Sequence, residues 1–383
     1  MAILASFSTL SPGLWMRMFM AMLTTTVTAL VIVSNRHLLS QLMQERDDAR
    51  AVQASHTGSP LRLGGIAILA GLAAGLLVGN WDSMALPALL FASAVPVLLA
   101  GLWEDLGFGM PALRRLAAAF VSAALAVVLL GTWVTRADLP GLDRALALAP
   151  PGVVFTLLLA AGFCHATNLI DGLNGLAAVV VISAATGLAV LAHGAGQDDL
   201  ALTAVMLGAA MVGFSLLNYP FGKIFLGDAG SYGVGHMLIW IAILLADRDA
   251  GVAMPALLLL VFWPFADTLH SVARRRVAGA SVFAPDRMHL HQKMRRCIEI
   301  VWLGGQHRKR SNPLATLVLA PMIMAPVVTG VIFGDNVRAA WIAVGVFATL
   351  FSLSHVAITR LSIRYRCRAK DAGGAHTTRY RAG

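Results

Sequence analysis

Charged residues are scarce in this sequence. Asp, Glu, Lys and Arg together make up 13% of the 383 residues, whereas hydrophobic residues make up 58%. Soluble domains carry about a quarter charged residues, so this composition excludes an ordinary soluble protein and indicates a membrane protein. Cysteine is rare as well. Cys164, Cys297 and Cys367 lack the spacing of a metal site or a disulfide pattern, and we interpret them as free thiols.

Apolar runs long enough to cross a bilayer fill most of the chain. A membrane-spanning helix needs roughly 20 mostly apolar residues. We therefore predict an all-α, polytopic membrane helix bundle of about 11 transmembrane helices. A single integral-membrane domain covers residues 1–357, and we expect the basic tail, 358–383, to be disordered. The predicted spans are 14–34, 61–79, 84–102, 115–132, 151–167, 174–192, 199–217, 232–246, 251–269, 314–333 and 338–357. The eighth span is the shortest of them.

The basic residues predict the orientation of the bundle. Of the 29 Lys and Arg residues, 24 lie in alternate loops and in the tail, and the other side has only five. Cytoplasmic loops carry an excess of Lys and Arg. We therefore expect a multi-pass membrane protein with the N-terminus outside and the C-terminus in the cytoplasm. The predicted cytoplasmic loops are 35–62, 103–115, 167–174, 218–231 and 270–313.

Polar motifs lie in these predicted cytoplasmic loops, where acidic or amide groups beside apolar spans suggest function. Glu104 and Asp105 end the third span, and they form either an interfacial pair that terminates a helix or a site for a divalent cation or phosphate. Asn168, Asp171 and Asn174 recur at about one helical turn, so we expect them to share a face; the alternative is a plain turn with Asn174 as a helix cap.

The next loop contains Asn218 and the sequence Gly-Asp-Ala-Gly-Ser from Gly227 to Ser231. Glycine-rich backbone before a helix, together with the Asp228 carboxylate, suits a phosphate-bound Mg²⁺. Upstream, Pro60 to Gly65 is either a linker or the border of an anionic ligand.

Two further groups lie near the large basic loop. Asp267 either pairs with Arg274 to Arg276 or lines a cleft. Arg287, His289 and His291 suit a diphosphate better than zinc, because histidines at this spacing point to opposite sides of a strand and are not a helical zinc pair. Carboxylates, amides, arginines and an apolar bundle together suggest phosphoryl transfer between a soluble activated donor and a membrane lipid.

The ordered motifs resemble those of the polyprenyl-phosphate N-acetylhexosamine-1-phosphate transferases, over roughly residues 15–355. The resemblance implies that undecaprenyl phosphate attacks the β-phosphorus of a UDP-N-acetylamino sugar, with UMP as the leaving group and Mg²⁺ (or Mn²⁺) as cofactor. It also implies Glu104, Asp105 and Asp171 as catalytic residues and Asp228 as metal ligand. The residues it implies for substrate binding are Asn168, Asn174, Asn218, Arg287, His289 and His291.

Departures from the family pattern narrow the prediction. Glu104 stands where many members have aspartate, Gln292 follows the histidine motif where some have a third histidine, and the lysine that cell-wall-precursor members place before Gly64-Gly65 is absent. An initiator of a lipid-linked polysaccharide such as O-antigen, with UDP-GlcNAc as default donor, therefore fits better than synthesis of peptidoglycan lipid I. A membrane transporter is less consistent with polar groups at one face. We expect membrane lipid but no nucleic acid as a partner, and the resemblance allows a homodimer.

Overall fold

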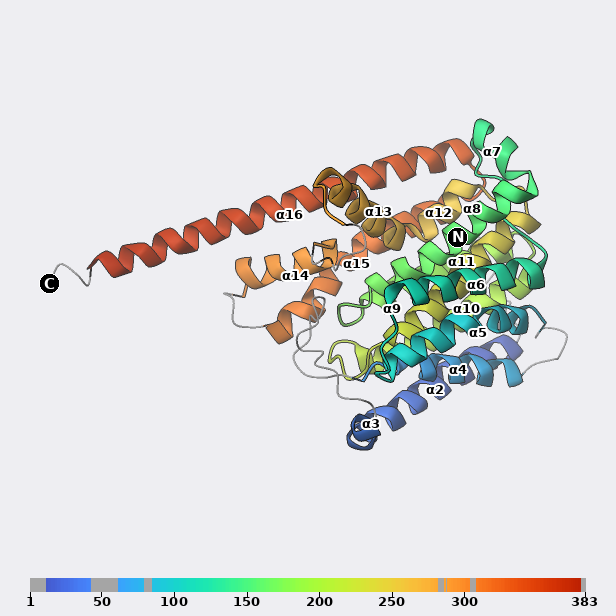
Figure 1. Cartoon of the computed structure of the whole chain (residues 1–383), viewed down its shortest axis with the longest axis horizontal. Helices are drawn as coiled ribbons and strands as arrows, with labels where there is room; N and C mark the ends of the chain where they lie inside the picture. Colours follow the sequence, from blue (N-terminus) through green and yellow to red (C-terminus); the bar gives the residue numbers. More distant parts are fainter. Residues whose placement is uncertain are drawn as a thin grey trace.

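A computed structural model describes residues 12–42, 61–78, 85–281, 286, 288–303 and 308–379. Within them the chain is helical apart from its connections and one isolated parallel β-bridge between Leu61 and Ile224. The predicted all-α membrane bundle is confirmed (Figure 1). The helices are α2 (Pro12–Ser34), α3 (Arg36–Leu42), α4 (Gly64–Leu77), α5 (Ala85–Asp105), α6 (Ala112–Leu130), α7 (Pro140–Leu146), α8 (Ala149–Leu169), α9 (Leu176–Gly194), α10 (Asp198–Asn218), α11 (Gly227–Arg248), α12 (Met254–Leu260), α13 (Phe262–Val277), α14 (Leu290–Val301), α15 (Arg308–Ile332) and α16 (Val337–Arg379).

Nine helices of the described residues are long and apolar enough to cross a membrane: α2, α5, α6, α8, α9, α10, α11, α15 and α16. Two of the predicted spans differ from this. The segment predicted at 61–79 forms α4, whose 14 residues extend only about 21 Å. The segment predicted at 251–269 is broken between α12 and α13 by a bend of 85°. Pro264 explains the break, because its ring cannot follow a regular helix past the carbonyl of Leu260.

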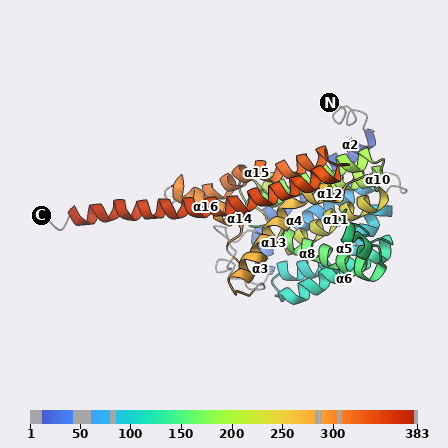
Figure 2. The ribbon, with the colours of Figure 1, turned by 90° about the horizontal axis from the view of Figure 1, so that it is seen from above.

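The central helix is α11, which lies inside the bundle among α4, α5 and α8 (Figures 1 and 2). Every residue in the most apolar 18-residue stretch of α11 is buried. The predicted span at 232–246 was too short, because the glycines and polar residues from Gly227 to Ser231 suggested a loop. They form the first turn of a 22-residue helix, whose residues from Gly227 to Leu245 are all buried.

The last helix leaves the bundle. α16 crosses the bundle from Val337 and continues as one helix to Arg379, away from the other helices (Figure 2). Residues 358–379 continue α16, and no proline interrupts them. Disorder of the tail stays a prediction. The predicted loop 270–313 likewise contains helical structure, namely the end of α13, all of α14 and the start of α15.

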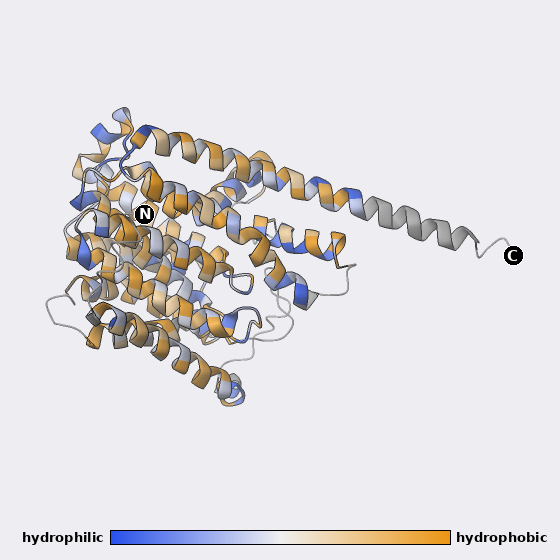
Figure 3. Cartoon of the chain, turned by 180° about the vertical axis from the view of Figure 1, so that it is seen from behind, coloured by the Kyte–Doolittle hydropathy of each residue, from blue (hydrophilic) through white to orange (hydrophobic). Residues whose placement is uncertain are grey.

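Hydrophobic residues occupy most of the length of the helices, and hydrophilic residues gather toward the helix ends and connections (Figure 3). Because successive long helices are antiparallel, the ends of α5, α8 and α10 and the starts of α6, α9 and α11 lie at one end of the bundle. This end, which we call the site end, carries the polar motifs.

Candidate active site

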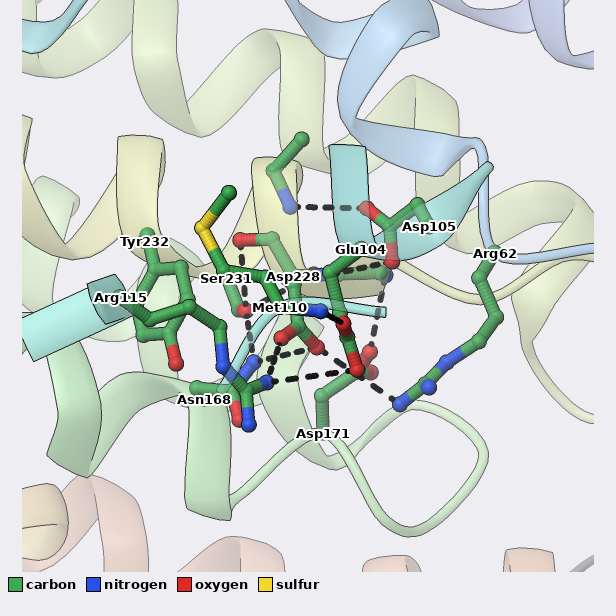
Figure 4. Close-up of polar contacts among 12 residues, drawn as sticks. Arg62, Glu104, Asp105, Met110, Arg115, Asn168, Asp171, Asp228, Ser231 and Tyr232 are labelled. Carbon is green, nitrogen blue, oxygen red and sulfur yellow. Dashed lines mark hydrogen bonds and ion pairs between the residues drawn. The ribbon is translucent and has the colours of Figure 1, made fainter. Parts of the chain in front are cut away.

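Six ionisable side chains meet at the site end, around the first turn of α11 (Figure 4). Four are carboxyl groups and two are guanidinium groups, and they come from α5, α6, α11, the α8–α9 connection and the segment before α4: Glu104, Asp105, Asp171, Asp228, Arg62 and Arg115. Glu104, Asp105 and Asp228 are all buried. A buried carboxylate is costly unless it is paired and hydrogen-bonded, so these partners account for the arrangement.

Asp228 is the centre of this group. Its carboxylate accepts a hydrogen bond from Arg115 and another from Asn168 Nδ2 at 3.0 Å. Arg62 adds a second guanidinium, with Nη2 3.8 Å from Asp228 Oδ1. The same Asn168 amide donates to Ser231 Oγ at 2.8 Å, so α8 is tied to the first turn of α11 twice. Asp228 is therefore held among cationic and amide donors.

Asp105 holds the start of α11. Its two carboxylate oxygens accept the backbone N–H groups of Asp228 and Ala229, each at 2.8 Å. The first N–H groups of a helix have no partner within the helix, and a negative charge beside them is favourable. Asp105 on α5 thus caps α11 from outside and fixes the position of Asp228.

Close helix packing explains the glycines of the motifs. A Cβ on Gly65 would lie 2.4 Å from Gly230 N, and one on Gly101 would lie 2.4 Å from Ala229 N. The N–H groups of Gly64 and Gly65 donate to the carbonyls of Phe225 and Leu226, both at 2.9 Å. The segment before α4 is thus hydrogen-bonded to the α10–α11 loop, and the interpretation of it as a simple linker is wrong, because Arg62 reaches Asp228.

Asp171 lies on the other side of the α11 N-terminus. Its Oδ2 accepts the Gly227 N–H at 3.1 Å. Burial raises the pKa of Asp171 to about 6, against the opposing effects of the Arg62 charge and the hydrogen bond from Gly227. Asp171 is thus an ionisable group that titrates close to neutral pH, next to Asp228.

The asparagines Asn168, Asn174 and Asn218 make different contacts in the structure. The prediction that Asn168, Asp171 and Asn174 share one helical face is wrong, because α8 ends at Leu169 and the following residues form turns. Asn174 Nδ2 donates to Pro220 O at 2.7 Å. Asn218 Oδ1 accepts the Gly175 N–H at 2.6 Å, and its Nδ2 donates to Ile224 O at 2.8 Å. These two amides connect the α8–α9 turn to the α10–α11 loop, whereas Asn168 alone contacts Asp228.

The histidine motif forms a second polar group at the start of α14. Asp267 on α13 accepts a hydrogen bond from His289 Nδ1 at 3.0 Å, and His291 Nδ1 lies 3.6 Å from the same oxygen. Burial would lower the pKa of His289, but its hydrogen bond to Asp267 and the nearby carboxylates raise it overall. The two imidazoles are nearly parallel, with centroids 5.7 Å apart. The expectation that they point oppositely is wrong, because they stand at the start of a helix and not in a strand.

The interpretation of Asp267 as the partner of Arg274 to Arg276 is also wrong. Arg274 and Arg275 pair instead with Asp286, which Arg274 contacts directly. Hydrogen bonds from the Ser271 hydroxyl and the Met288 N–H, together with the nearby His289 and Arg274, hold the pKa of Asp286 below its usual range despite partial burial. Arg287 and Pro60 lie outside the described residues.

Gly172 links the two polar groups. A Cβ added to Gly172 would lie 3.1 Å from His291 Nε2, so the imidazole packs directly on the residue that follows Asp171. A side chain at Gly172 would therefore press on the histidine, which would have to give by a few tenths of an ångström. Motifs more than a hundred residues apart in sequence therefore border one site.

Among the described residues, no three His, Cys, Asp or Glu side chains are arranged to hold a metal ion by themselves. Mg²⁺ in phosphate chemistry is commonly held by one or two carboxylates, water and substrate phosphates. Asp228 and Asp171, at the α11 N-terminus, offer such hard oxygen ligands, and the donor set fits a Mg²⁺ ion that a diphosphate would complete.

Some residues of the site could not be identified from the sequence patterns. Arg115 stood out only as one of two basic residues at the start of a span, but it contacts Asp228 and lies 3.9 Å from Glu104 Oε1. Tyr232 lies one turn beyond Asp228, beside Arg115 (Figure 4). His355 gave no signal, because it stands in the last apolar helix, far from every motif, and only the packing of α16 places it 3.9 Å from Asp267.

Comparison with known proteins gives a consistent result. Residues 86–246 match the model of glycosyl transferase family 4, a stretch that contains Glu104, Asp171 and Asp228. A decaprenyl-phosphate N-acetylglucosaminephosphotransferase of Mycobacterium leprae is 30% identical over 320 residues, which cover 76% of this chain and 77% of that protein. An undecaprenyl-phosphate alpha-N-acetylglucosaminyl 1-phosphate transferase of Yersinia pestis is 27% identical over 80% of this chain and 82% of its own length. A phospho-N-acetylmuramoyl-pentapeptide-transferase of Lactiplantibacillus plantarum is 26% identical over 65% of this chain and 80% of its own length.

Proposed function

The chain belongs to glycosyl transferase family 4, the polyprenyl-phosphate N-acetylhexosamine-1-phosphate transferases, and we propose that its donor is UDP-GlcNAc and its acceptor undecaprenyl phosphate. An oxygen of the lipid phosphate forms a bond to the β-phosphorus of the donor. The bond from that phosphorus to the oxygen bridging the α-phosphate breaks, and its electron pair leaves with UMP. The product is a lipid diphosphate sugar.

The observation that carries this proposal is the convergence of separate motifs on the first turn of α11. Asp228, Asp171 and Asn168 offer oxygen and amide groups, while Arg62 and Arg115 offer two guanidinium groups at the same place. Arginine suits phosphate because its planar donors bind phosphate oxygens in pairs. The buried setting strengthens each of these interactions relative to water.

In this proposal Asp228 and Asp171 would hold Mg²⁺ (or Mn²⁺). The ion, when bound, supplies positive charge that stabilises the phosphate oxygens during transfer. The chain's own residues do the remaining work. Arg115 and Arg62 bind phosphate oxygens, Asp105 keeps Asp228 in place through the α11 N-terminus, and Asn168 orients the Asp228 carboxylate. Glu104, whose Oε1 lies 3.9 Å from Arg115 Nη1, is proposed to act near the acceptor phosphate.

The same proposal assigns the site to the cytoplasmic face of a bacterial inner membrane. The predicted cytoplasmic loops and the tail carry 24 of the 29 Lys and Arg residues, and cytoplasmic parts of membrane proteins are rich in these residues. UDP-sugars are soluble and charged, so a site at this end meets its donor without any transport step.

The pathway we propose is the start of a lipid-linked polysaccharide such as O-antigen. The lysine that cell-wall-precursor members place before the Gly-Gly pair is absent before Gly64, which supports this over lipid I synthesis. The transporter alternative finds no support in the position of the polar motifs, because the bounds of α5, α8, α10 and α11 place them at helix ends and not halfway along the bundle.

Membranes that contain the full chain, supplied with undecaprenyl phosphate, Mg²⁺ and a panel of UDP-N-acetylamino sugars, test the proposal. We expect release of UMP with UDP-GlcNAc, loss of that release with EDTA, and loss in Asp228→Asn with the protein still inserted. Full activity of Asp228→Asn, or full activity in EDTA, would contradict the Mg²⁺ assignment. Release from UDP-MurNAc-pentapeptide alone would contradict the pathway.

A further inference from the structure

Asp267 lies at the centre of the second polar group, the one that contains His289 and His291. Asp267 is 2% exposed, and both of its oxygens have partners. Oδ2 accepts from His289 Nδ1 at 3.0 Å, and Oδ1 accepts the backbone N–H of Leu290 at 3.1 Å. Leu290 is the first residue of α14, so Asp267 caps α14 from α13, just as Asp105 caps α11 from α5. The capped helix start fixes where His291 points.

His291 is fully buried, and neither ring nitrogen has a hydrogen-bond partner among the described residues. Its Nδ1 lies 3.6 Å from Asp267 Oδ2, and its Nε2 faces Gly172, within 3.1 Å of where a Cβ would stand. Burial lowers the pKa of His291, which favours the neutral ring with one N–H and one lone pair. The negative charge of Asp267 favours the proton on Nδ1, so the lone pair on Nε2 faces the Asp171–Gly172 turn.

The last helix, α16, also contacts Asp267. His355 on α16 places Nε2 3.9 Å from Asp267 Oδ1, and its ring stacks on His270 of α13 with centroids 3.9 Å apart. One turn later, Thr359 Oγ1 accepts a hydrogen bond from Lys293 Nζ of α14 at 3.2 Å. α16 thus contacts α13 through His355 and α14 through Thr359, and the three helices surround the histidine motif.

We propose that Asp267 and His355 are positioning residues, which present His291 Nε2 as a hydrogen-bond acceptor to an N–H or O–H group of the nucleotide-sugar donor at the Asp171–Gly172 turn. The inference rests on the proposed function for the identity of the donor, but the orientation of His291 does not depend on catalysis. A buried acceptor that faces the site without a partner is costly unless a ligand group satisfies it. His291 therefore contributes to recognition of the donor, and α16 is part of the site although it carries none of the family motifs.

The orientation is tested first without substrate. Histidine labelled with ¹⁵N in the purified full chain shows which ring nitrogen carries the proton, with His291→Gln used to assign the signal. We expect the proton of His291 on Nδ1 in the wild-type protein. In Asp267→Asn the side-chain amide donates instead of accepting, and the proton of His291 should move to Nε2. A proton on Nε2 in the wild-type protein, or an unchanged tautomer in Asp267→Asn, would overturn the proposal.

A second experiment separates positioning from packing. His355→Phe keeps the ring on His270 but removes the nitrogens, His355→Gln restores an N–H near the position of Nε2, and Phe351→Leu alters an apolar neighbour on the same face of α16. We expect His355→Phe to lower kcat/KM for the UDP-sugar by about tenfold or more at an unchanged unfolding temperature, with partial recovery in His355→Gln. An equal loss in Phe351→Leu, or no loss in His355→Phe, would overturn the role of His355.

The two experiments distinguish the inference from the function on which it rests. Wild-type protein that releases no UMP from any UDP-N-acetylamino sugar would refute the proposed function. The ¹⁵N spectra would still decide the orientation of His291.

Discussion

Two glycines determine how closely α4 and α5 approach the first turn of α11. Gly65 and Gly101 each bring a helix backbone within reach of the backbone at Ala229 and Gly230, so no side chain separates the three helices. Asp228 stands in this turn, and its position therefore depends on residues that carry no functional group. Small residues at helix contacts permit such close approach in membrane proteins.

Gly65→Ala is expected to damage the site through packing. The added methyl would lie 2.4 Å from Gly230 N, so the helices must separate, and we expect a loss of about 1–3 kcal/mol of folding free energy together with lower activity. Gly162→Ala on α8 is the matched control, because a Cβ there has nothing within 4 Å. Unfolding temperature in detergent checks both variants, and an unchanged value for Gly65→Ala would contradict the packing account.

Asp171 is expected to make the rate depend on pH near neutrality. Burial raises its pKa to about 6, which means that protons bind as the pH falls from 7 to 5 and remove a negative charge from the site. We expect kcat/KM to fall over that range in the wild-type protein. In Asp171→Asn the rate should be low throughout and this acidic limb should disappear. If the limb remained at the same pH in Asp171→Asn, another group would be responsible.

At this scale the sequence showed which residues are unusual but not what each one contacts. Glu104, Asp105, Asn168, Asp171 and Asp228 were all predicted, and all five meet at one place. That Asp105 caps a helix could not be predicted, because its partners are backbone N–H groups more than a hundred residues away. Arg115 escaped notice because a basic residue at the end of a membrane helix is most often a topology signal.

α11 is the central helix of the bundle, and side chains from other segments hold both of its ends. Its first turn is capped by Asp105, and its last turn is held by Arg136 at the opposite end of the bundle, about 30 Å away for a helix of this length. The Arg136 guanidinium donates to the carbonyls of Ala246, Asp249 and Val252, and it pairs with Asp138 at 2.7 Å. The carbonyls at a helix C-terminus lack partners within the helix, and Arg136 satisfies them.

Arg136→Ala is expected to destabilise the protein without altering the site chemistry. Removal of these hydrogen bonds should lower the free energy of unfolding by on the order of 2 kcal/mol, while activity well below the unfolding temperature stays near that of the wild type. Arg248→Ala is the control. Its ion pair with Asp199 is largely exposed, and we expect less than about 1 kcal/mol. Equal unfolding temperatures for the two variants would show that Arg136 is not a structural anchor.

Helices of membrane length could be predicted well, whereas irregular ones could not. Hydropathy is a sum over many residues, and it located the nine long helices. The start of α11 was missed because glycine and polar residues usually mark loops, and only burial by three neighbouring helices stabilises them as a helix. The 85° break between α12 and α13 depends on Pro264, and hydropathy does not register backbone geometry.

The whole molecule is asymmetric in charge along the direction of its helices. Among the described residues, most Lys and Arg lie at the site end, and the opposite end has clustered acidic residues, among them Asp198, Asp199, Asp247 and Asp249. The structure assigns these residues to opposite helix ends, and the positive-inside rule then predicts which end faces the cytoplasm.

A pair of single-cysteine substitutions on exposed residues checks this orientation. Lys223→Cys lies in the α10–α11 loop at the site end, and Ala250→Cys lies after α11 at the opposite end. In intact cells we expect a membrane-impermeant thiol reagent to label Ala250→Cys, and to label Lys223→Cys only after the inner membrane is opened. Labelling of Lys223→Cys in intact cells would reverse the orientation and with it the cytoplasmic site.

Phosphosugar transfer itself is tested most directly by following the β-phosphate of the donor. Purified full-length protein receives undecaprenyl phosphate, Mg²⁺ and UDP-GlcNAc that carries ³²P in the β-phosphate. We predict that the label enters the organic phase with the lipid, in equal amount to the UMP released, and that Asp228→Asn transfers none. Label that stays in water as UDP would show transfer of the sugar without its phosphate and would contradict the account.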